Sequence, residues 1–144
     1  MDRQGFQHWL DAYVAAWKSY DRDEIRALFS DDAVYRYSPD PDGDAMQGRD
    51  AIADDWLAGK DEPGTYEAKY EPLAIDGDLH VASGTTTYLN ADGSKRDEYY
   101  NVYICRFNDE GECASFTEYW MQKNEFRKAA RDELVRKAKA GEIS

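Results

Sequence analysis

Glu118 is the residue of this sequence with the clearest potential for chemistry. It lies between Phe116 and Trp120 in a segment rich in Thr, Tyr and Trp, which indicates a β-strand. Because the side chains of a strand alternate between its two faces, Glu118 shares a face with both aromatic residues. A carboxylate buried among them loses hydration, which raises its pKa and suits it to proton transfer. We predict a catalytic Glu118; an exposed strand-end glutamate and a buried hydrogen-bonded pair without catalysis are the alternatives.

The register of the last hairpin determines which residues accompany this carboxylate. The sequence Asn-Asp-Glu-Gly at 108–111 is typical of a turn, and we take Asp109 and Glu110 as a two-residue loop. The facing pairs are then Tyr103 and Phe116, Asn101 and Glu118, and Tyr99 and Trp120. The opposite face bears Tyr100, Val102, Ile104, Thr117, Tyr119 and Met121. Asn101 is thus predicted to donate a hydrogen bond to Glu118, and a slip of one residue would exchange the two faces.

Cysteines and histidines give no sign of a metal centre. The same register places Cys105 and Cys113 on opposite faces, which predicts free thiols, as in a reducing compartment. His8 and His80 are far apart and lack ligand spacing. The acidic run at 40–44 has its glycine too early for a calcium loop and no glutamate at the twelfth position. We expect neither a metal nor a cofactor.

Helices dominate the first part of the chain. Six apolar residues recur at helical spacing in the first segment and share one face: Phe6, Trp9, Leu10, Tyr13, Val14 and Trp17. A second, short helix begins after Asp21, which has Glu24 three residues on and is predicted as its N-cap. The residues at 33–37 indicate a strand, those at 39–48 a loop, and those at 49–58 a third helix with Ile52 and Trp56 on its inner side.

From Thr65 onward the pattern is that of long strands. Segments near 65–75, 79–90, 95–107 and 113–122 are rich in Tyr, Thr, Val and Phe and are separated by turn sequences. Strands joined by short turns are antiparallel neighbours, so the chain is predicted as an α+β fold with helices packed into a curved antiparallel sheet. The last helix, 124 to about 140, is predicted to pack on this body or on a second subunit. We expect one domain at 1–123 and a helical extension at 124–144.

Composition excludes several classes of partner. The 144 residues have a net charge of −12, which argues against nucleic acid and anionic membranes because phosphate binding requires basic residues. No apolar run approaches the roughly 20 residues of a membrane span, and the N-terminus does not have the pattern of a signal peptide. A soluble, cytoplasmic protein is the expectation. Aromatic residues make up 14% of the chain, mostly Tyr and Trp, which suit the walls of a mixed-polarity pocket.

The order of elements resembles the nuclear transport factor 2-like superfamily, the cone-shaped fold that includes ketosteroid isomerase and the SnoaL-like polyketide cyclases. The resemblance covers residues from about 6 to 124 and is clearest at 12–17 (AYVAAW), 28–34 (LFSDDAV), 48–52 (GRDAI) and 106–111 (RFNDEG). It implies an oxyanion donor at Tyr13 and a second at Tyr103. The isomerase base falls on Tyr37, which is unsuited to that role near neutral pH, so steroid isomerisation is disfavoured. An acidic residue on a late strand of the cyclases corresponds to Glu118.

Three functions remain open on these grounds. The first is a cofactor-independent lyase or isomerase, such as a cyclase or dehydratase, in which Tyr13 and Tyr103 polarise a carbonyl and Glu118, held by Asn101, moves a proton. The second is a non-catalytic module that binds a small apolar or aromatic molecule. Its predicted wall is Trp17, Tyr37, Trp56, Tyr88, Tyr99, Phe116 and Trp120. The third is an interaction module with a filled cavity. In each case the outer face of the last hairpin is predicted to form a homodimer.

Overall fold

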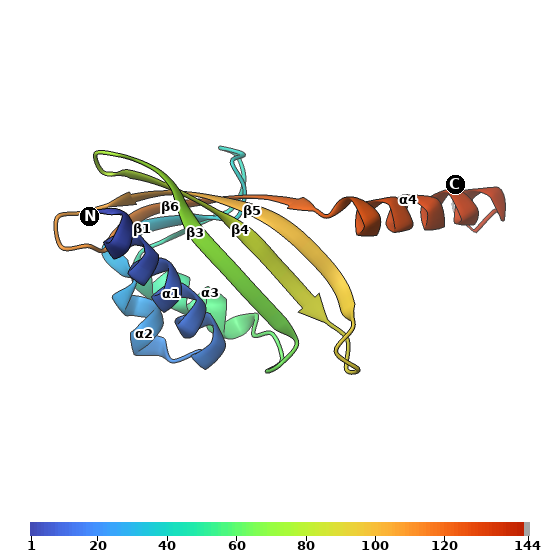
Figure 1. Cartoon of the computed structure of the whole chain (residues 1–144), viewed down its shortest axis with the longest axis horizontal. Coiled ribbons are helices and arrows are strands. Elements are labelled where there is room, and N and C mark those ends of the chain that lie inside the picture. Colours follow the sequence, from blue (N-terminus) through green and yellow to red (C-terminus); the bar gives the residue numbers. More distant parts are fainter. Residues whose placement is uncertain (143–144) are drawn as a thin grey trace.

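The computed structural model describes residues 1–142, which form helices at one end and a long curved sheet (Figure 1). Its elements are α1 (Arg3–Ser19), α2 (Arg22–Ala27), β1 (Phe29–Arg36), β2 (Ala45–Gln47), α3 (Arg49–Ala58), β3 (Tyr66–Asp76), β4 (Leu79–Leu89), β5 (Lys95–Phe107), β6 (Cys113–Gln122) and α4 (Asn124–Lys139). This is the predicted α+β class, and the bounds of the four long strands agree with the predicted segments to within a few residues.

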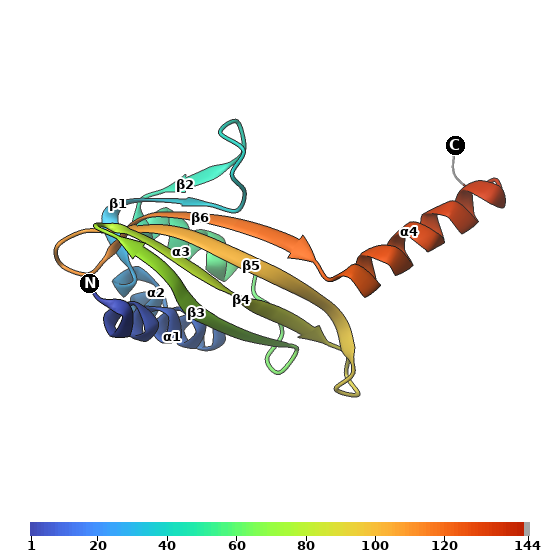
Figure 2. The same ribbon diagram turned by 45° about the horizontal axis from the view of Figure 1, so that its top comes forward.

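The strands of the sheet are antiparallel except for one parallel pair. Its strand order is β2-β1-β6-β5-β4-β3, and every neighbouring pair is antiparallel except β1 and β6. Figures 1 and 2 show α1, α2 and α3 gathered on one side of the curved strands. The prediction of a loop at 39–48 missed β2, a three-residue strand that pairs with β1. Such a short strand depends on its neighbour for backbone hydrogen bonds and has no periodic pattern of its own.

Helix α2 begins at its predicted cap, and α1 packs through its predicted face. The side chain of Asp2 accepts a hydrogen bond from Gly5 N at 2.8 Å and caps α1, and Asp21 accepts from Glu24 N at 3.0 Å and caps α2. The buried residues of α1 are Phe6, Trp9, Leu10, Tyr13 and Ala16. Val14 and Trp17 are partly buried against the same core. The predicted face of α1 is therefore its core face.

The pairing of β5 with β6 differs from the predicted register by two residues. Asn101 faces Trp120, and Tyr103 faces Glu118. The turn is longer than two residues, because Asn108 N donates to Glu112 O at 2.9 Å, and Ala114 is an extra residue between Arg106–Ser115 and Phe107–Cys113. Each feature shifts the pairing by one position. Because the total is even, Glu118 keeps the predicted inner face while its partner across the ladder changes.

The two cysteines are on the same side of the sheet, so the prediction of opposite faces was wrong. Cys105 and Cys113 are free thiols with no exposed surface. The bulge at Ala114 reverses the alternation between Cys113 and Phe116, which turns Cys113 inward. Burial raises the pKa of the Cys105 thiol well above its ordinary value, and a hydrogen bond with Cys113 raises it further. The Cys105 thiol therefore stays protonated in the core.

Gly84 allows a close approach of β3 and β4. It pairs with Tyr70 on β3 and with Asn101 on β5, two residues that line the site described below. A Cβ atom at position 84 would collide with the backbone oxygen of Lys69 and with the ring of Tyr70. Glycine is therefore required here for the ring of Tyr70 to lie against the sheet.

Helix α4 extends away from the rest of the chain. It follows β6 directly, and Figures 1 and 2 show it projecting beyond the end of the sheet. None of its residues is buried, and Leu134 is 58% exposed. It therefore does not pack across the body of its own chain, the first of the two predicted arrangements. Among residues 1–142, no helix has both the length and the apolar character required to cross a membrane.

Candidate functional site

A cavity of about 710 Å³ opens between the helices and the inner face of the sheet. Its walls come from α1, α3, β1, β3, β4, β5 and β6 and from the residues that follow α1, β1 and α3. The lining residues are Tyr13, Trp17, Tyr20, Tyr35, Tyr37, Asp55, Trp56, Gly59, Asp61, Tyr70, Thr86, Tyr88, Arg96, Asp97, Tyr99, Asn101, Tyr103, Glu118 and Trp120. A space of this volume is typical of a small-molecule site.

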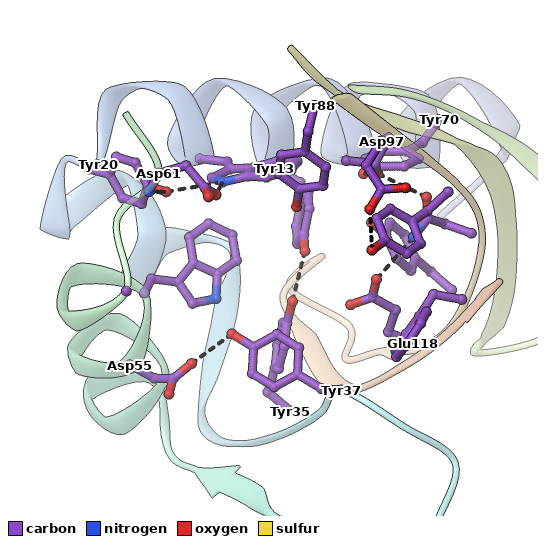
Figure 3. A pocket seen from close by; sticks show the side chains of 18 of the residues that line it. Tyr13, Tyr20, Tyr35, Tyr37, Asp55, Asp61, Tyr70, Tyr88, Asp97 and Glu118 are labelled. Atoms are coloured by element: carbon purple, nitrogen blue, oxygen red, sulfur yellow. Dashed lines mark hydrogen bonds between the residues drawn. The ribbon is translucent and has the colours of Figure 1, made fainter. Parts of the chain in front are cut away.

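Two tyrosines meet at the floor of the cavity. The hydroxyls of Tyr13 on α1 and Tyr35 on β1 are 2.7 Å apart, and both rings are almost completely buried. The ring of Phe116 stacks on both, with centroids 5.5 Å from Tyr13 and 4.5 Å from Tyr35. In Figure 3 the two hydroxyls meet in the middle of the view, and Glu118 points toward the same space. Only one hydroxyl proton is used in this pair, so the other is free to donate to a ligand.

A line of hydrogen bonds holds Glu118 in place. Asn101 Nδ2 donates to Glu118 Oε1 at 3.0 Å, and Asn101 Oδ1 accepts from Thr86 Oγ1 at 2.8 Å. The hydroxyl of Tyr70 contacts Thr86 Oγ1. Since the Thr86 proton is directed at Asn101, Tyr70 must be the donor in that contact. The line therefore fixes the orientation of the Asn101 amide, with its NH₂ group toward Glu118.

Glu118 has a strongly shifted acidity. Burial raises its pKa from the ordinary 4.5 to about 7, against the opposing effect of the Asn101 hydrogen bond. Near neutral pH the carboxyl group is therefore present in both protonation states. This is the property required of a general acid or base that works at neutral pH.

The buried tyrosines are neutral hydrogen-bond donors. Burial raises the pKa values of Tyr13, Tyr35 and Tyr103 well above 10, and the charge of Glu118 raises them further. Burial likewise raises the pKa of Tyr70 to about 12. These phenols stay protonated at physiological pH and can stabilise a developing negative charge.

Three aspartates surround the mouth of the cavity, each bound to an aromatic residue. Asp55 Oδ2 accepts from Tyr37 OH at 2.7 Å, and Asp97 Oδ2 accepts from Tyr99 OH at 2.8 Å. Asp61 Oδ2 accepts from Trp17 Nε1 at 3.2 Å; this is the third of these pairs. Figure 3 shows Asp55 and Asp61 on one side of the cavity and Asp97 on the other.

Most of the residues predicted for the site line the cavity. All four predicted catalytic residues, Glu118, Tyr13, Tyr103 and Asn101, do so. Of the predicted wall, Trp17, Tyr37, Trp56, Tyr88, Tyr99 and Trp120 line it as well. Phe116 does not: it has no exposed surface and lies beneath the tyrosine pair. Their roles toward a ligand stay predictions.

Sequence analysis missed other lining residues: Tyr20, Tyr35, Asp55, Gly59, Asp61, Tyr70, Thr86, Arg96 and Asp97. Tyr70 and Thr86 lie on the neighbouring strands β3 and β4, whose faces we had not assigned. The inner-face alternation of β5 extends from Asn101 and Tyr99 to Asp97 and could have identified this aspartate.

His80 is outside the cavity. Its ring nitrogens lie 2.9 Å from Asp78 O and 3.0 Å from Met1 O, and its ring packs against Phe6 and Phe107. It is therefore a buried structural residue. Across residues 1–142, no group of three or more His, Cys, Asp or Glu side chains is arranged to hold a metal ion.

Comparisons with known proteins agree on the fold. The SnoaL-like domain matches residues 10–116. An NTF2-like protein of unknown function from Burkholderia xenovorans is similar in structure, with a TM-score of 0.63 and 21% identity over 83% of this chain and 85% of that one. An epoxide hydrolase from M. tuberculosis of the LEH-like type has a TM-score of 0.60 and 15% identity over 83% and 84% of the two chains.

A putative ketosteroid isomerase from Kribbella flavida has a TM-score of 0.59 and 18% identity, over 85% of this chain and 82% of that one. No curated protein matches by sequence. At these identities the structural likenesses establish the fold, and activity has to be argued from the cavity.

Proposed function

The chain belongs to the SnoaL-like domain family, and we propose that its cavity binds a small, flat, partly polar molecule on which Glu118 performs proton transfer. The observation that supports this most directly is the position of Glu118. Its carboxyl group lines a cavity of about 710 Å³, is held by Asn101, and has a pKa of about 7 because of burial. The reaction class that suits these groups is a cofactor-independent isomerisation, cyclisation or dehydration.

In this proposal the ionised Glu118 removes a proton from a carbon next to a carbonyl group and later returns it. The tyrosines at the cavity floor, Tyr13 with its partner Tyr35, donate to the carbonyl oxygen as it gains negative charge. Tyr103, which faces Glu118 across the ladder, is a second donor. Because burial keeps these phenols neutral, they act as donors and leave the base role to Glu118.

A non-catalytic binding module is the second candidate, and a specific observation favours it. The polar groups near the mouth are already paired with one another, as Tyr37 is with Asp55 and Tyr99 with Asp97. Such pairs give a preformed cavity that requires little rearrangement to accept a ligand. Aromatic side chains on several walls would supply most of the contact area.

One experiment separates the two functions. A library of polyphenols and of aromatic ketones with and without an amino group is screened by tryptophan fluorescence, because Trp17, Trp56 and Trp120 line the cavity. Each compound that binds is then followed for chemical change with the wild type, Glu118→Gln and Tyr13→Phe. Glu110→Gln, in the exposed β5–β6 turn, is the control.

For an enzyme, we expect Glu118→Gln to bind normally and to lose roughly 10²- to 10⁴-fold in turnover, the usual effect of a positioned general base. Tyr13→Phe should slow turnover with little effect on folding. For a binding module, no compound changes and Glu118→Gln binds as the wild type does. If no compound quenches the fluorescence saturably, both proposals are wrong.

A further inference from the structure

The cavity is lined by more acidic than basic side chains. Four carboxyl groups line it, those of Asp55, Asp61, Asp97 and Glu118, against one cationic side chain, that of Arg96. Three of these carboxyl groups come from separate parts of the fold: Asp55 from α3, Asp97 from β5 and Glu118 from β6. Because they lie on different walls, a bound molecule is exposed to negative charge from several directions.

Among residues 1–142, no cationic side chain forms an ion pair with these carboxylates. Asp55 accepts from Tyr37 OH, Asp61 from Trp17 Nε1, and Asp97 from Tyr99 OH and Gln122 Nε2, all of which are neutral donors. Within residues 1–142, the ion pairs of Lys and Arg go to other acids. A hydrogen bond from a phenol or an indole orients a carboxylate and leaves its charge in place.

The cations near the mouth are held by aromatic rings. Arg96 lies over the ring of Tyr88, with its guanidinium carbon 5.5 Å from the centroid, and its side chain is exposed. Lys60 lies 5.6 Å from the centroid of Tyr20 and is likewise exposed. Both Tyr88 and Tyr20 line the cavity, so two of its aromatic rings already have a cationic side chain within cation–π distance.

We propose that the molecule bound in this cavity is a cation: an amine or quaternary ammonium group on an aromatic or apolar body. This inference rests on the proposed function and specifies its ligand class. Carboxylates distributed around aromatic walls are the two components that recognise an organic cation, through charge attraction and cation–π contact. A carboxylate or phosphate ligand would be attracted by Arg96 alone and repelled by the four carboxyl groups.

The protonation of Glu118 provides an independent signature. A cation beside this carboxyl group favours its ionised form, so binding releases a proton when the pH is at or below the pKa of about 7. The other titratable groups that influence Glu118 or are influenced by it are Tyr13, Tyr35, Tyr37, Tyr70, Tyr88 and Tyr103. Their pKa values are all raised, so they stay neutral and the released proton reports on Glu118.

The test uses four ligands of matched shape: 2-naphthylmethylamine, its trimethylammonium derivative, 2-naphthylmethanol and 2-naphthoate. Affinities are measured by titration calorimetry at pH 6 and pH 8, in two buffers of different ionisation enthalpy. We expect the two cations to bind about ten-fold or more tightly than the alcohol, as one or two nearby charges would give. The trimethylammonium derivative, whose own charge is fixed, should release a proton at pH 6 and bind more tightly at pH 8.

Variants then test which groups are responsible. Asp61→Asn keeps an oxygen that can accept from Trp17 Nε1. It should lower the affinity for the two cations about five-fold and change the affinity for the alcohol by less than about two-fold. Asp109→Asn, in the exposed turn away from the cavity, is the control and should change neither. If the alcohol or the naphthoate binds as tightly as the cations, the charge inference is wrong and the proposed binding site stands. If none of the four binds, both are wrong.

Discussion

Glu118 and Asn101 are diagonal neighbours in the β5–β6 ladder, and their side chains meet at 3.0 Å although neither faces the other. The residue opposite Glu118 is Tyr103, and the residue opposite Asn101 is Trp120. Diagonal neighbours are within reach of long side chains. The contact holds the carboxyl group of Glu118 in the cavity through one hydrogen bond from the Asn101 amide.

The stability of the protein should depend on pH through Glu118. Its pKa rises from 4.5 to about 7 on folding, so the folded state holds a proton between these values that the unfolded state has released. The contribution of the protonated Glu118 to the free energy of unfolding is therefore complete below about pH 4.5. As the pH rises to 7, the free energy of unfolding falls by about 2 to 3 kcal/mol. Glu118→Gln should lack this loss and be the more stable protein at pH 8.

Chemical unfolding of both proteins at pH 5, 6, 7 and 8 measures this effect. The difference in unfolding free energy between the wild type and Glu118→Gln isolates the glutamate from other titrating groups. A difference that is constant across this range would contradict the assigned burial of the carboxyl group.

Thr86→Val should uncouple Asn101 from Tyr70. Valine has the shape of threonine without its hydroxyl, so it leaves the Asn101 Oδ1 and Tyr70 OH groups without their partner. An unsatisfied buried polar group costs about 1–3 kcal/mol. Thr85→Val is the matched control, because this neighbour lies on the opposite face of β4, and it should change stability by less than about 0.5 kcal/mol.

Carbon NMR of the Glu118 carboxyl group distinguishes orientation from simple destabilisation. With the Asn101 amide no longer fixed, the hydrogen bond that lowers the pKa of Glu118 weakens. The pKa should therefore rise further in Thr86→Val and stay unchanged in Thr85→Val. An unchanged pKa in both variants would show that the line of hydrogen bonds does not orient Asn101.

Removal of residues 124–144 should leave the rest of the fold intact. Helix α4 has no buried residue, so a chain that ends at Lys123 loses little contact area and should unfold within about 0.5 kcal/mol of the full protein. A chain that ends at Met121 is the control. It also loses Gln122, which donates to Asp97, and Lys123, whose Nζ lies 3.1 Å from Glu98, and it should be clearly less stable.

The outer face of the sheet is proposed to form a homodimer. Tyr100, Tyr119 and Met121 are 52%, 46% and 58% exposed on this face, and exposed apolar side chains that gather on one face are typical of an interface. Light scattering at micromolar concentration should give about twice the chain mass of 16.5 kDa. Tyr119→Glu should shift the mass to that of one chain. Leu73→Glu, at a residue on β3 that is 61% exposed, should not.

The sequence predicted the elements better than the contacts between them. The helical spacing of α1 and the turn residues between β3, β4, β5 and β6 are local signals, and the elements that they predict were found. The predicted hydrogen bond from Asn101 to Glu118 was found. The residue predicted to face Glu118 across the ladder was wrong, because pairing depends on the length of one turn and on a bulge at Ala114, which has no sequence signature of its own. The predicted face of Glu118 was nevertheless right. The longer turn and the bulge each shift the pairing by one residue in the same direction, and a shift of two residues leaves each side chain on its original face.

The site was predictable where strand alternation or helical spacing sets the direction of a side chain, as it does for Tyr13 and Trp17 on α1. Asn101, Tyr103 and Glu118 follow from one hairpin. Asp55 and Asp61 lie near the end of α3 and in the segment after it, where side-chain direction depends on how the helix packs against the sheet. Phe116 was assigned to the wall because it shares a face with Glu118, but that face also supplies the core beneath the cavity.

The bulge at Ala114 separates the hairpin turn from the part of β6 that contains Glu118. Beyond the bulge, β6 is paired on both sides, with Tyr35 of β1 and Cys105 of β5 both facing Phe116. The orientation of Glu118 is therefore set by two neighbouring strands and is independent of the turn. Insertions between Asn108 and Glu112 should be accommodated by the loop, so an affinity tag or a fluorescent reporter could be placed there without altering the cavity.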